Sequence, residues 1–483
     1  MQVQGSLCDG ARTLQFAKPF KIDSRTSAST DRVIRMEQTH EFHLGGEDNG
    51  MIVTYIPVGL QPGKNIGLLK DHSIRYTLVC LCGVAASKSS PDNIAACVVG
   101  IHPSHCLDAK DAKTIAHDIL QLFLPHAEGE RITVQLSKAD PLPYNQQVRR
   151  NYCAADRATP ELFPGASVSG QGASGTLSFI TTIEGPGSGL KGNGCRIAAI
   201  SAHVGNPCFM EETSPPTGQD VLSPSALLSE ATNSYHGRAR VVGHTIVPSS
   251  HIGSTTQCNG TSTRQDVVLV EIDSGQPQHK PVSWTLRNHM TIHHEPGSFE
   301  PHDVVMLGAA SGVSTGTLSS TKANIALYCG AELVVETTEC VMISDEGHAP
   351  TYGDSDALIY NAAELQNNLE GDIPSVAAGI LWGGNAQKHP GGGSKDQTNV
   401  QLRLTSFEVN IGLLSFYTEL DAVLGGVVAP YLDGMYGRGQ YSLNWSCGPS
   451  AGRSGGNVGS GGAADSSVSD MHDVTHALAN LGV

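Results

Sequence analysis

The chain has 483 residues, enough for two or three domains, and only 16% of them are charged. Its formal net charge of −16 argues against nucleic acid or an anionic membrane as a partner, because both favour a basic surface. No apolar run approaches the ~20 residues needed to cross a membrane, and the start of the chain has no secretory pattern. We therefore expect an intracellular protein, cytoplasmic or nuclear, with mostly reduced cysteines.

The first part of the chain predicts a small α+β domain. Residues 1–30 are polar and are expected to be irregular. Between residues 31 and 160, strand-like apolar segments surround an amphipathic helix over residues 108–126. The role of this domain is open, and recruitment of a partner or of a second copy of the chain is the working hypothesis.

Two histidine-containing clusters leave metal binding open as an alternative. Neither has the HExxH arrangement or a second ligand pair, so a structural role is favoured. The sequence therefore predicts neither a metal nor an organic cofactor. The clusters are His102, His105 and Cys106, and His289, His293, His294 and His302 with Glu295.

A polar connection with several prolines over residues 140–172 separates the first domain from the rest. Residues 170–175 match GxGxxG, but a strand-like segment follows instead of a helix, which excludes a dinucleotide site. Short strands and Gly-rich turns then predict an all-β domain over residues 168–428, with a helix at 413–424. Residues 431–483 predict a Gly- and Ser-rich tail with a short terminal helix.

Three segments of the all-β domain predict nucleophilic chemistry. Ser355 lies in a Gly-Asp-Ser turn before an apolar strand, which presents its hydroxyl at a fixed, exposed point. His203 ends the apolar segment 196–203, and Asp266 opens another. Serine catalysis needs a base and a group that orients this base, and His203 and Asp266 are the candidates.

In order and context, these segments resemble those of the trypsin-like serine peptidases. The Gly/Thr-rich segment 312–318 and the segment 379–384 resemble a hairpin and the substrate-cleft strand of that family. Intracellular members typified by the plant narrow-leaf peptidase are the most similar. The resemblance covers residues 170–425 and implies a chymotrypsin-like double β-barrel that hydrolyses peptide bonds.

The resemblance also implies a role for each site residue. Ser355 is the nucleophile, His203 the general base and Asp266 its orienter, while the N–H groups of Gly353 and Ser355 bind the oxyanion. Protein or peptide substrates would pair with the cleft strand by strand addition. The residues implied to contact the substrate are Ala349, Leu381, Trp382 and Gly383.

The acidic residues on either side of the serine raise two separate questions: Asp356 departs from the family pattern, and Asp354 needs a hydrogen-bond partner. Asp356 stands where the family has glycine, and a carboxylate ~6 Å from an oxyanion would cost about 3 kcal/mol. In secreted members of the family, a freed N-terminus pairs with the aspartate before the serine. The sequence predicts no cleavable boundary before an Ile- or Val-led strand, so Asp354 is expected to have another partner. A catalytically inactive protein that binds peptides or serves as a scaffold is therefore the alternative function. Ala349 is not acidic, so cleavage after Lys or Arg is not implied.

Overall fold

The structure is a computed structural model. The residues that it describes are 12–17, 39–44, 52–53, 63–84, 94–123, 132–143, 162–170, 173–184, 195–205, 218–226, 239–247, 251–258, 260–273, 275–276, 286, 299, 302–345, 349–367, 377–385 and 411–445.

Strands dominate these residues. The strands are β1 (Arg12–Ala17), β2 (Thr39–Leu44), β3 (Ile52–Val53), β4 (Tyr76–Val84), β5 (Ile94–Ile101), β6 (Ile132–Lys138), β7 (Leu142–Pro143), β8 (Ser167–Ser169), β9 (Ser174–Thr176), β10 (Ile180–Glu184), β11 (Cys195–Ile200), β12 (Asp220–Ser223), β13 (Arg240–Val247), β14 (Thr255–Cys258), β15 (Thr261–Arg264), β16 (Val268–Ile272), β17 (Asp303–Gly308), β18 (Gly312–Leu318), β19 (Ala323–Cys329), β20 (Glu332–Ser344), β21 (Leu358–Asn361), β22 (Ala377–Gly384), β23 (Leu414–Glu419) and β24 (Ser442–Asn444). The helices are α1 (Gly63–Asp71), α2 (Ala109–Phe123), α3 (Ala202–Gly205), α6 (Ala362–Asn367), α7 (Leu420–Val423) and α8 (Ala429–Tyr436), with a 3₁₀ turn η4 (Ile411–Leu413) and a π-turn η5 (Leu424–Val428).

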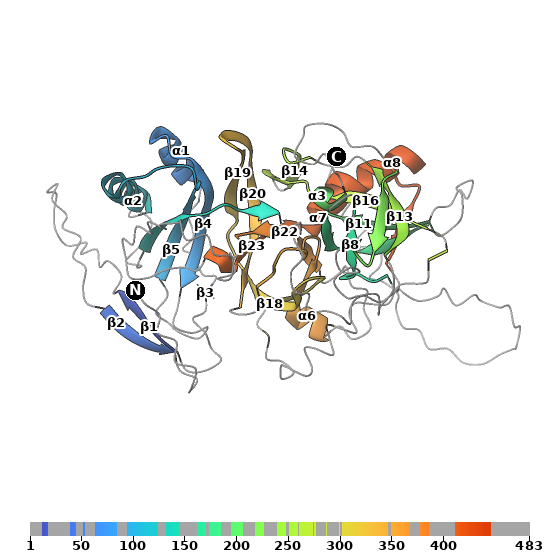
Figure 1. Ribbon diagram of the computed structural model, residues 1–483, viewed down its shortest axis with the longest axis horizontal. Helices are drawn as coiled ribbons and strands as arrows, with labels where there is room; N and C mark the ends of the chain where they lie inside the picture. The colour runs from blue at the N-terminus through green and yellow to red at the C-terminus, as the bar shows by residue number, and fades with distance from the viewer. Residues whose placement is uncertain are drawn as a thin grey trace, which may run out of the picture.

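The middle of the molecule in Figure 1 is a closed antiparallel sheet. Its strands follow the order β18-β17-β21-β22-β23-β20, and β20 pairs back onto β18 through Gly316 and Ser344. Closure removes the free edges of these six strands. The inward side chains are apolar, as the period-2 pattern requires, and Met306, Ile359 and Leu381 share one buried cluster.

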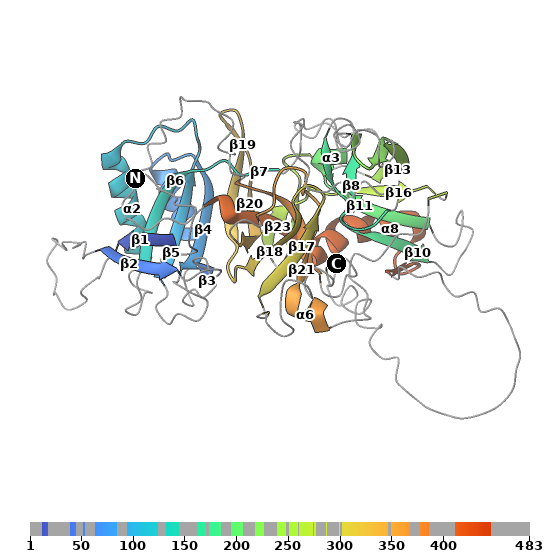
Figure 2. The same cartoon turned by 60° about the horizontal axis from the view of Figure 1, so that its bottom comes forward.

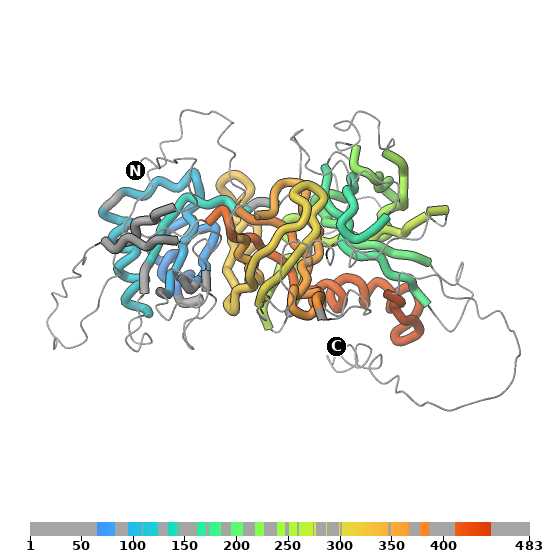
Figure 3. Tube along the Cα trace, turned by 90° about the horizontal axis from the view of Figure 1, so that it is seen from below, coloured from blue at the N-terminus to red at the C-terminus, as the bar shows by residue number. Residues whose placement is uncertain are grey.

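A second curled sheet lies beside this closed sheet, coloured green in Figure 1. Its strand order is β24-β10-β11-β16-β13-β12-β8-β9. Apolar residues of β11 and β16, such as Ile197 and Leu269, are fully buried. From α7 to α8 the chain runs along one side of this sheet, as Figure 3 shows in red, and Leu432 of α8 joins its core. The two sheets and their shared core place the site between them.

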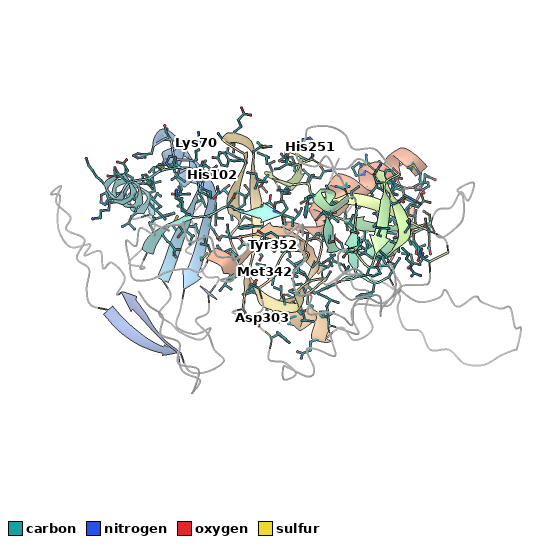
Figure 4. The ribbon with its side chains drawn as sticks, in the orientation of Figure 1. Lys70, His102, His251, Asp303, Met342 and Tyr352 are labelled. Carbon is teal, nitrogen blue, oxygen red and sulfur yellow. The ribbon has the colours of Figure 1, made fainter. Side chains whose placement is uncertain are left out.

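The N-terminal elements continue the sheet beyond β20, which pairs with β19 as well as with β18 and β23. Strand β4 pairs with β19 through Leu78 and Ile325, and β5 and β6 follow beyond it, with α1 and α2 on one face. Figure 4 shows Lys70 and His102 on this side of the molecule. Across the junction, Tyr76 Oη donates to Glu336 Oε1 at 2.6 Å. The N-terminal elements and the closed sheet therefore share a hydrogen-bonded sheet.

The helix expected over residues 108–126 is confirmed as α2. Asp108 lies just before it, and its Oδ1 accepts the N–H groups of Lys110 at 2.9 Å and Asp111 at 2.7 Å. These bonds satisfy donors that the first turn of a helix leaves unpaired. None of the described helices is long and apolar enough to cross a membrane.

Two expectations for the C-terminal part need correction. The helix expected over residues 413–424 is wrong in its first half, because Leu414–Glu419 forms strand β23. This segment, Leu-Ser-Phe-Tyr-Thr-Glu, pairs with both β20 and β22, and this tertiary pairing decides its conformation. The tail expected from residue 431 begins later, since α8 continues to Tyr436 and β24 pairs with β10. The expected terminal helix lies outside the described residues.

Candidate active site

The turn over residues 353–357, which is predicted to carry the nucleophile and is called the nucleophile turn below, leads into β21 and contains Ser355. Gly353 has a φ of 101°, in the left-handed region that favours glycine. The N–H of Asp354 donates to the carbonyl of Thr351 at 3.1 Å, and the N–H of Ala357 donates to the carbonyl of Asp354 at 3.0 Å. Hydrogen bonds therefore close the turn on both sides of the serine.

The carboxylate of Asp354 anchors this turn to the β17–β18 loop. Its Oδ1 accepts the N–H groups of Ala310 at 2.8 Å and Ser311 at 2.9 Å, and its Oδ2 accepts the N–H of Thr351 at 2.8 Å. Burial raises the pKa of Asp354, and these N–H groups offset part of that effect. The partner that the sequence left open is thus the backbone of a neighbouring loop, so the turn is held without a freed N-terminus.

His203 lies between Ser355 and Asp266. Its Nε2 is 2.8 Å from Ser355 Oγ, its Nδ1 is 2.6 Å from Asp266 Oδ2, and its backbone N–H donates to Asp266 Oδ1 at 3.2 Å. The structure therefore brings together the three residues that the sequence singled out. Their elements are α3, the β15–β16 connection and the turn before β21, so both sheets contribute.

The charge of Asp266 fixes the tautomer of His203. Burial raises the pKa of Asp266, but the charges of His203 and Arg264 and the bonds from His203 outweigh burial and leave this pKa below its ordinary value. An ionised carboxylate only accepts hydrogen bonds, so when His203 is neutral its single ring proton is on Nδ1. Nε2 is then the acceptor for the Ser355 hydroxyl, which is the arrangement that a general base requires.

The carboxyl group of Asp356 contacts Ser201, the residue that follows β11. Asp356 has a φ of 78°, and its carboxyl oxygens accept short hydrogen bonds from the N–H and the hydroxyl of Ser201. Both residues are fully buried, and burial raises the pKa of Asp356 well above its usual range. The sequence prediction placed this carboxylate near the oxyanion. Instead it links the nucleophile turn to the residue two positions before His203.

A buried cation completes the surroundings of Asp266. Nη2 of Arg264 is 3.3 Å from Asp266 Oδ2, and the guanidinium carbon lies 4.5 Å from the ring centroid of Trp382. Glu339, also fully buried, accepts the backbone N–H of Arg264 at 2.7 Å and Nε1–H of Trp382 at 3.3 Å. Burial lowers the pKa of Arg264, and the two carboxylates offset part of this. The Arg264 side chain thereby contacts both Asp266 and Trp382 of β22.

The strand expected to bind substrate lies directly beside Ser355. Leu381, Trp382 and Gly383 belong to β22 and are buried, and the carbonyl oxygen of Trp382 is 3.4 Å from Ser355 Oγ. Ala349 is half-buried, and its role at the base of a specificity pocket stays a prediction. The serine itself is 0% exposed, so the expectation of an exposed hydroxyl is wrong for this conformation.

Two N–H groups of the nucleophile turn have no acceptor among the described residues. Within the described part of the chain, the backbone N–H groups of Gly353 and Ser355 donate to no protein acceptor. The carbonyl oxygens of the same two residues already accept hydrogen bonds from Thr176. Gly353 O accepts the Thr176 hydroxyl at 3.0 Å, and Ser355 O accepts the Thr176 N–H at 2.7 Å. Figure 4 places Tyr352, the residue before this turn, near Met342 within the closed sheet. Paired carbonyls and unpaired N–H groups suit an anionic oxygen.

The described residues contain no group of three or more His, Cys, Asp or Glu side chains that could hold a metal. Nδ1 of His102 is bonded to the hydroxyl of Ser104 at 2.7 Å, and its ring packs on Tyr328. Most of the second histidine cluster, over residues 289–295, lies outside the described residues.

Sequence reasoning missed three residues that hold the site: Ser201, Arg264 and Glu339. Ser201 and Arg264 each lie two positions before a predicted catalytic residue, which is a weak local signal. Glu339 has no such signal, because its partners Thr263 and Arg264 are 76 and 75 residues away in the chain. Only folding brings it to the site.

Comparison with known proteins gives similarity at the level of structures alone. No family model matches the chain, and no curated protein matches it. Similar solved structures include Thermobifida fusca Protease A, with 13% identity and a TM-score of 0.28 over 59% of this chain and 98% of that one. Cellulomonas bogoriensis chymotrypsin has 14% identity and a TM-score of 0.27, over 59% of this chain and 98% of that one.

A third similar structure is described as a glutamic acid specific serine protease that uses a histidine triad in substrate binding. It has 13% identity and a TM-score of 0.26, and the match covers 55% of this chain and 97% of that one. Because all three TM-scores are low, the functional proposal rests on the residues of this chain.

Proposed function

We propose that the chain is a serine endopeptidase with a chymotrypsin-like double β-barrel, related to the intracellular trypsin-like peptidases. The observation that carries the proposal is His203, whose two ring nitrogens lie 2.8 Å from Ser355 Oγ and 2.6 Å from Asp266 Oδ2. A hydroxyl, an imidazole and an ionised carboxylate in this chain of contacts are the minimum for nucleophilic attack.

In the proposed reaction, Ser355 Oγ attacks the carbonyl carbon of the scissile peptide bond while His203 Nε2 takes the hydroxyl proton. Asp266 holds the imidazole in the Nδ1–H tautomer and stabilises the imidazolium that forms. The N–H groups of Gly353 and Ser355 bind the oxyanion. His203 then gives its proton to the leaving amine, and water hydrolyses the acyl-enzyme by the same steps. No metal or organic cofactor takes part.

The acidic neighbours of the serine are compatible with this reaction. The Asp356 carboxyl is bonded to Ser201, and Asp354 is bonded to three backbone N–H groups. We assign both to positioning the turn. We further propose that residues 31–160 form an α+β domain that recruits substrates, another protein or a second copy of the chain, and that the protein is intracellular.

Cleavage of a peptide library tests the proposal. The wild-type chain should cleave peptides, and Ser355→Ala should lose at least about 10⁴-fold of the rate. Ser442→Ala is the matched control, because Ser442 lies on β24 with an exposed side chain and should retain the wild-type rate. Equal cleavage by wild type and Ser355→Ala would contradict the proposal.

The second candidate function is that of an inactive relative that binds peptides. Complete burial of Ser355, together with 4% exposure of His203, is the observation that favours it. A folded wild type that binds library peptides without cleaving any of them would favour this second function.

A further inference from the structure

One edge of β22 is already occupied by another part of the same chain. From Gly379 to Gly384, β22 pairs with β23 along one edge. On the other edge β21 pairs only as far as Leu381, whose N–H donates to Ala357 O at 3.0 Å and whose carbonyl accepts Asp356 N–H at 2.8 Å. Beyond that point the partner is β7, where Pro143 lies opposite Gly383 and Leu142 opposite Gly384.

Strand β7 occupies the place where an extended substrate would pair. The first residue of β22 past β21 is Trp382, whose carbonyl oxygen is 3.4 Å from Ser355 Oγ. The pairing is antiparallel, so the chain passes from Leu142 to Pro143 in the direction of the nucleophile. Figure 2 shows the chain coming to β7 from the N-terminal side of the molecule.

The composition of β7 indicates what this edge accepts. Proline has no N–H, so it fits only at a ladder position that needs no donor. Hydrogen-bonded and non-hydrogen-bonded pairs alternate in an antiparallel ladder. Pro143 opposite Gly383 is therefore the non-hydrogen-bonded pair, and Leu142 opposite Gly384 is the pair that exchanges N–H and C=O bonds.

The segment before β7 is firmly attached. The N–H of Ala139 donates to Ile101 O at 3.1 Å, and its carbonyl accepts the hydroxyl of Thr77 at 2.8 Å. Only Asp140 and Pro141 thus separate the anchored Ala139 from Leu142. A short tether gives its end an effective concentration on the order of millimolar, against which any free peptide must compete.

We infer that this edge of β22 is a groove for extended peptides with proline opposite Gly383, and that Leu142–Pro143 is its resident occupant, which a substrate must displace. The inference rests on the proposed function in taking β22 as the substrate strand. It deepens that function by naming a class of substrate and a built-in competitor. The full burial of Ser355 agrees with an occupied groove.

The test uses the full chain with Ser355→Ala to prevent cleavage, and a fluorescent synthetic peptide Lys-Ala-Asp-Pro-Leu-Pro-Tyr. Adding Leu142→Pro removes the N–H that pairs with Gly384 and should tighten peptide binding by about tenfold or more. Leu142→Ala is the matched control, because it keeps this N–H, and should bind within about twofold of the parent. A scrambled peptide should bind weakly to all three proteins.

A milder variant guards against a folding defect in Leu142→Pro. Replacing Pro141 and Pro143 with glycine keeps the Leu142 N–H but raises the conformational entropy of the free segment. It should tighten peptide binding by about threefold. Equal peptide affinity in the parent and both variants would overturn the inference.

Labelling by a fluorophosphonate separates this inference from the proposed function. With Ser355 restored, Leu142→Pro should be labelled faster than wild type. Tighter peptide binding without labelling of any variant would support the occupied groove and sink the peptidase. Equal labelling rates in wild type and Leu142→Pro, together with equal peptide affinity, would support the peptidase and overturn the occupied groove.

Discussion

The two sides of the candidate active site are held by different kinds of interaction. On the histidine side, charged side chains do the holding: Asp266 contacts His203 and Arg264, and Glu339 lies behind Arg264. On the serine side, the turn is held by three backbone N–H groups, which donate to the Asp354 carboxylate. The position of His203 should therefore respond to changes of charge, whereas that of Ser355 depends on the shape of a turn. Three substitutions test this contrast.

The largest effect is expected on the serine side. Asp354→Ala leaves the N–H groups of Ala310, Ser311 and Thr351 without their acceptor in a buried site. Each such loss costs about 1–3 kcal/mol, so the free energy of unfolding should fall by roughly 3–9 kcal/mol. Guanidinium unfolding measures this free energy. Asp71→Ala is the control, because Asp71 is exposed, and should stay within about 0.5 kcal/mol of wild type. A loss as small as that of the control would remove the anchoring role of Asp354.

A smaller effect is expected on the histidine side. Arg264→Met leaves Asp266 buried without its cation, and breaking such a pair costs about 3–5 kcal/mol. A double-mutant cycle with Asp266→Asn should give a coupling energy of about 1–3 kcal/mol. The coupling energy follows from guanidinium unfolding of the wild type, the two single variants and the double variant. Additive effects would show that Arg264 does not act through Asp266.

The smallest effect concerns the link between the two sides, and it depends on pH. Burial raises the folded pKa of Asp356 above its ordinary value of 3.8, so the folded state holds a proton that the unfolded state releases. Stability from this group is therefore present below about pH 4 and declines as pH rises toward the folded pKa. Asp356→Asn removes the ionisation and keeps a group that can bond to Ser201.

Relative to wild type, Asp356→Asn should gain stability as pH rises above 4, by up to about 1.4 kcal/mol for each pH unit. Guanidinium unfolding at several pH values measures the difference between the two proteins. The other buried acids cancel in this difference. A difference that does not change with pH would mean that Asp356 titrates alike in both states.

The residues with a local signature were predictable from the sequence. Ser355, His203 and Asp266 each border an apolar strand, and the turn chemistry of Gly353 is local as well. The strand content and helix α2 followed from periodicity. What joins these pieces is non-local: Asp356 and Ser201 are 155 residues apart, and no pattern near either indicates the contact.

The segment around β7 was misinterpreted for a physical reason. Its two prolines lower strand propensity, so residues 140–143 read as a linker. Their extended conformation comes from the edge of β22, which lies more than two hundred residues further along the chain. The same holds for β23, where pairing with two strands outweighs the helical pattern.

The most direct test of the central claim is to map the adduct of a fluorophosphonate on the full chain. Mass spectrometry of the labelled protein should find the phosphonyl group on Ser355 and on no other serine. His203→Ala should slow labelling by at least about 10³-fold, because the base that takes the hydroxyl proton is gone. A folded wild type whose Ser355 is labelled no faster than in His203→Ala would contradict the account.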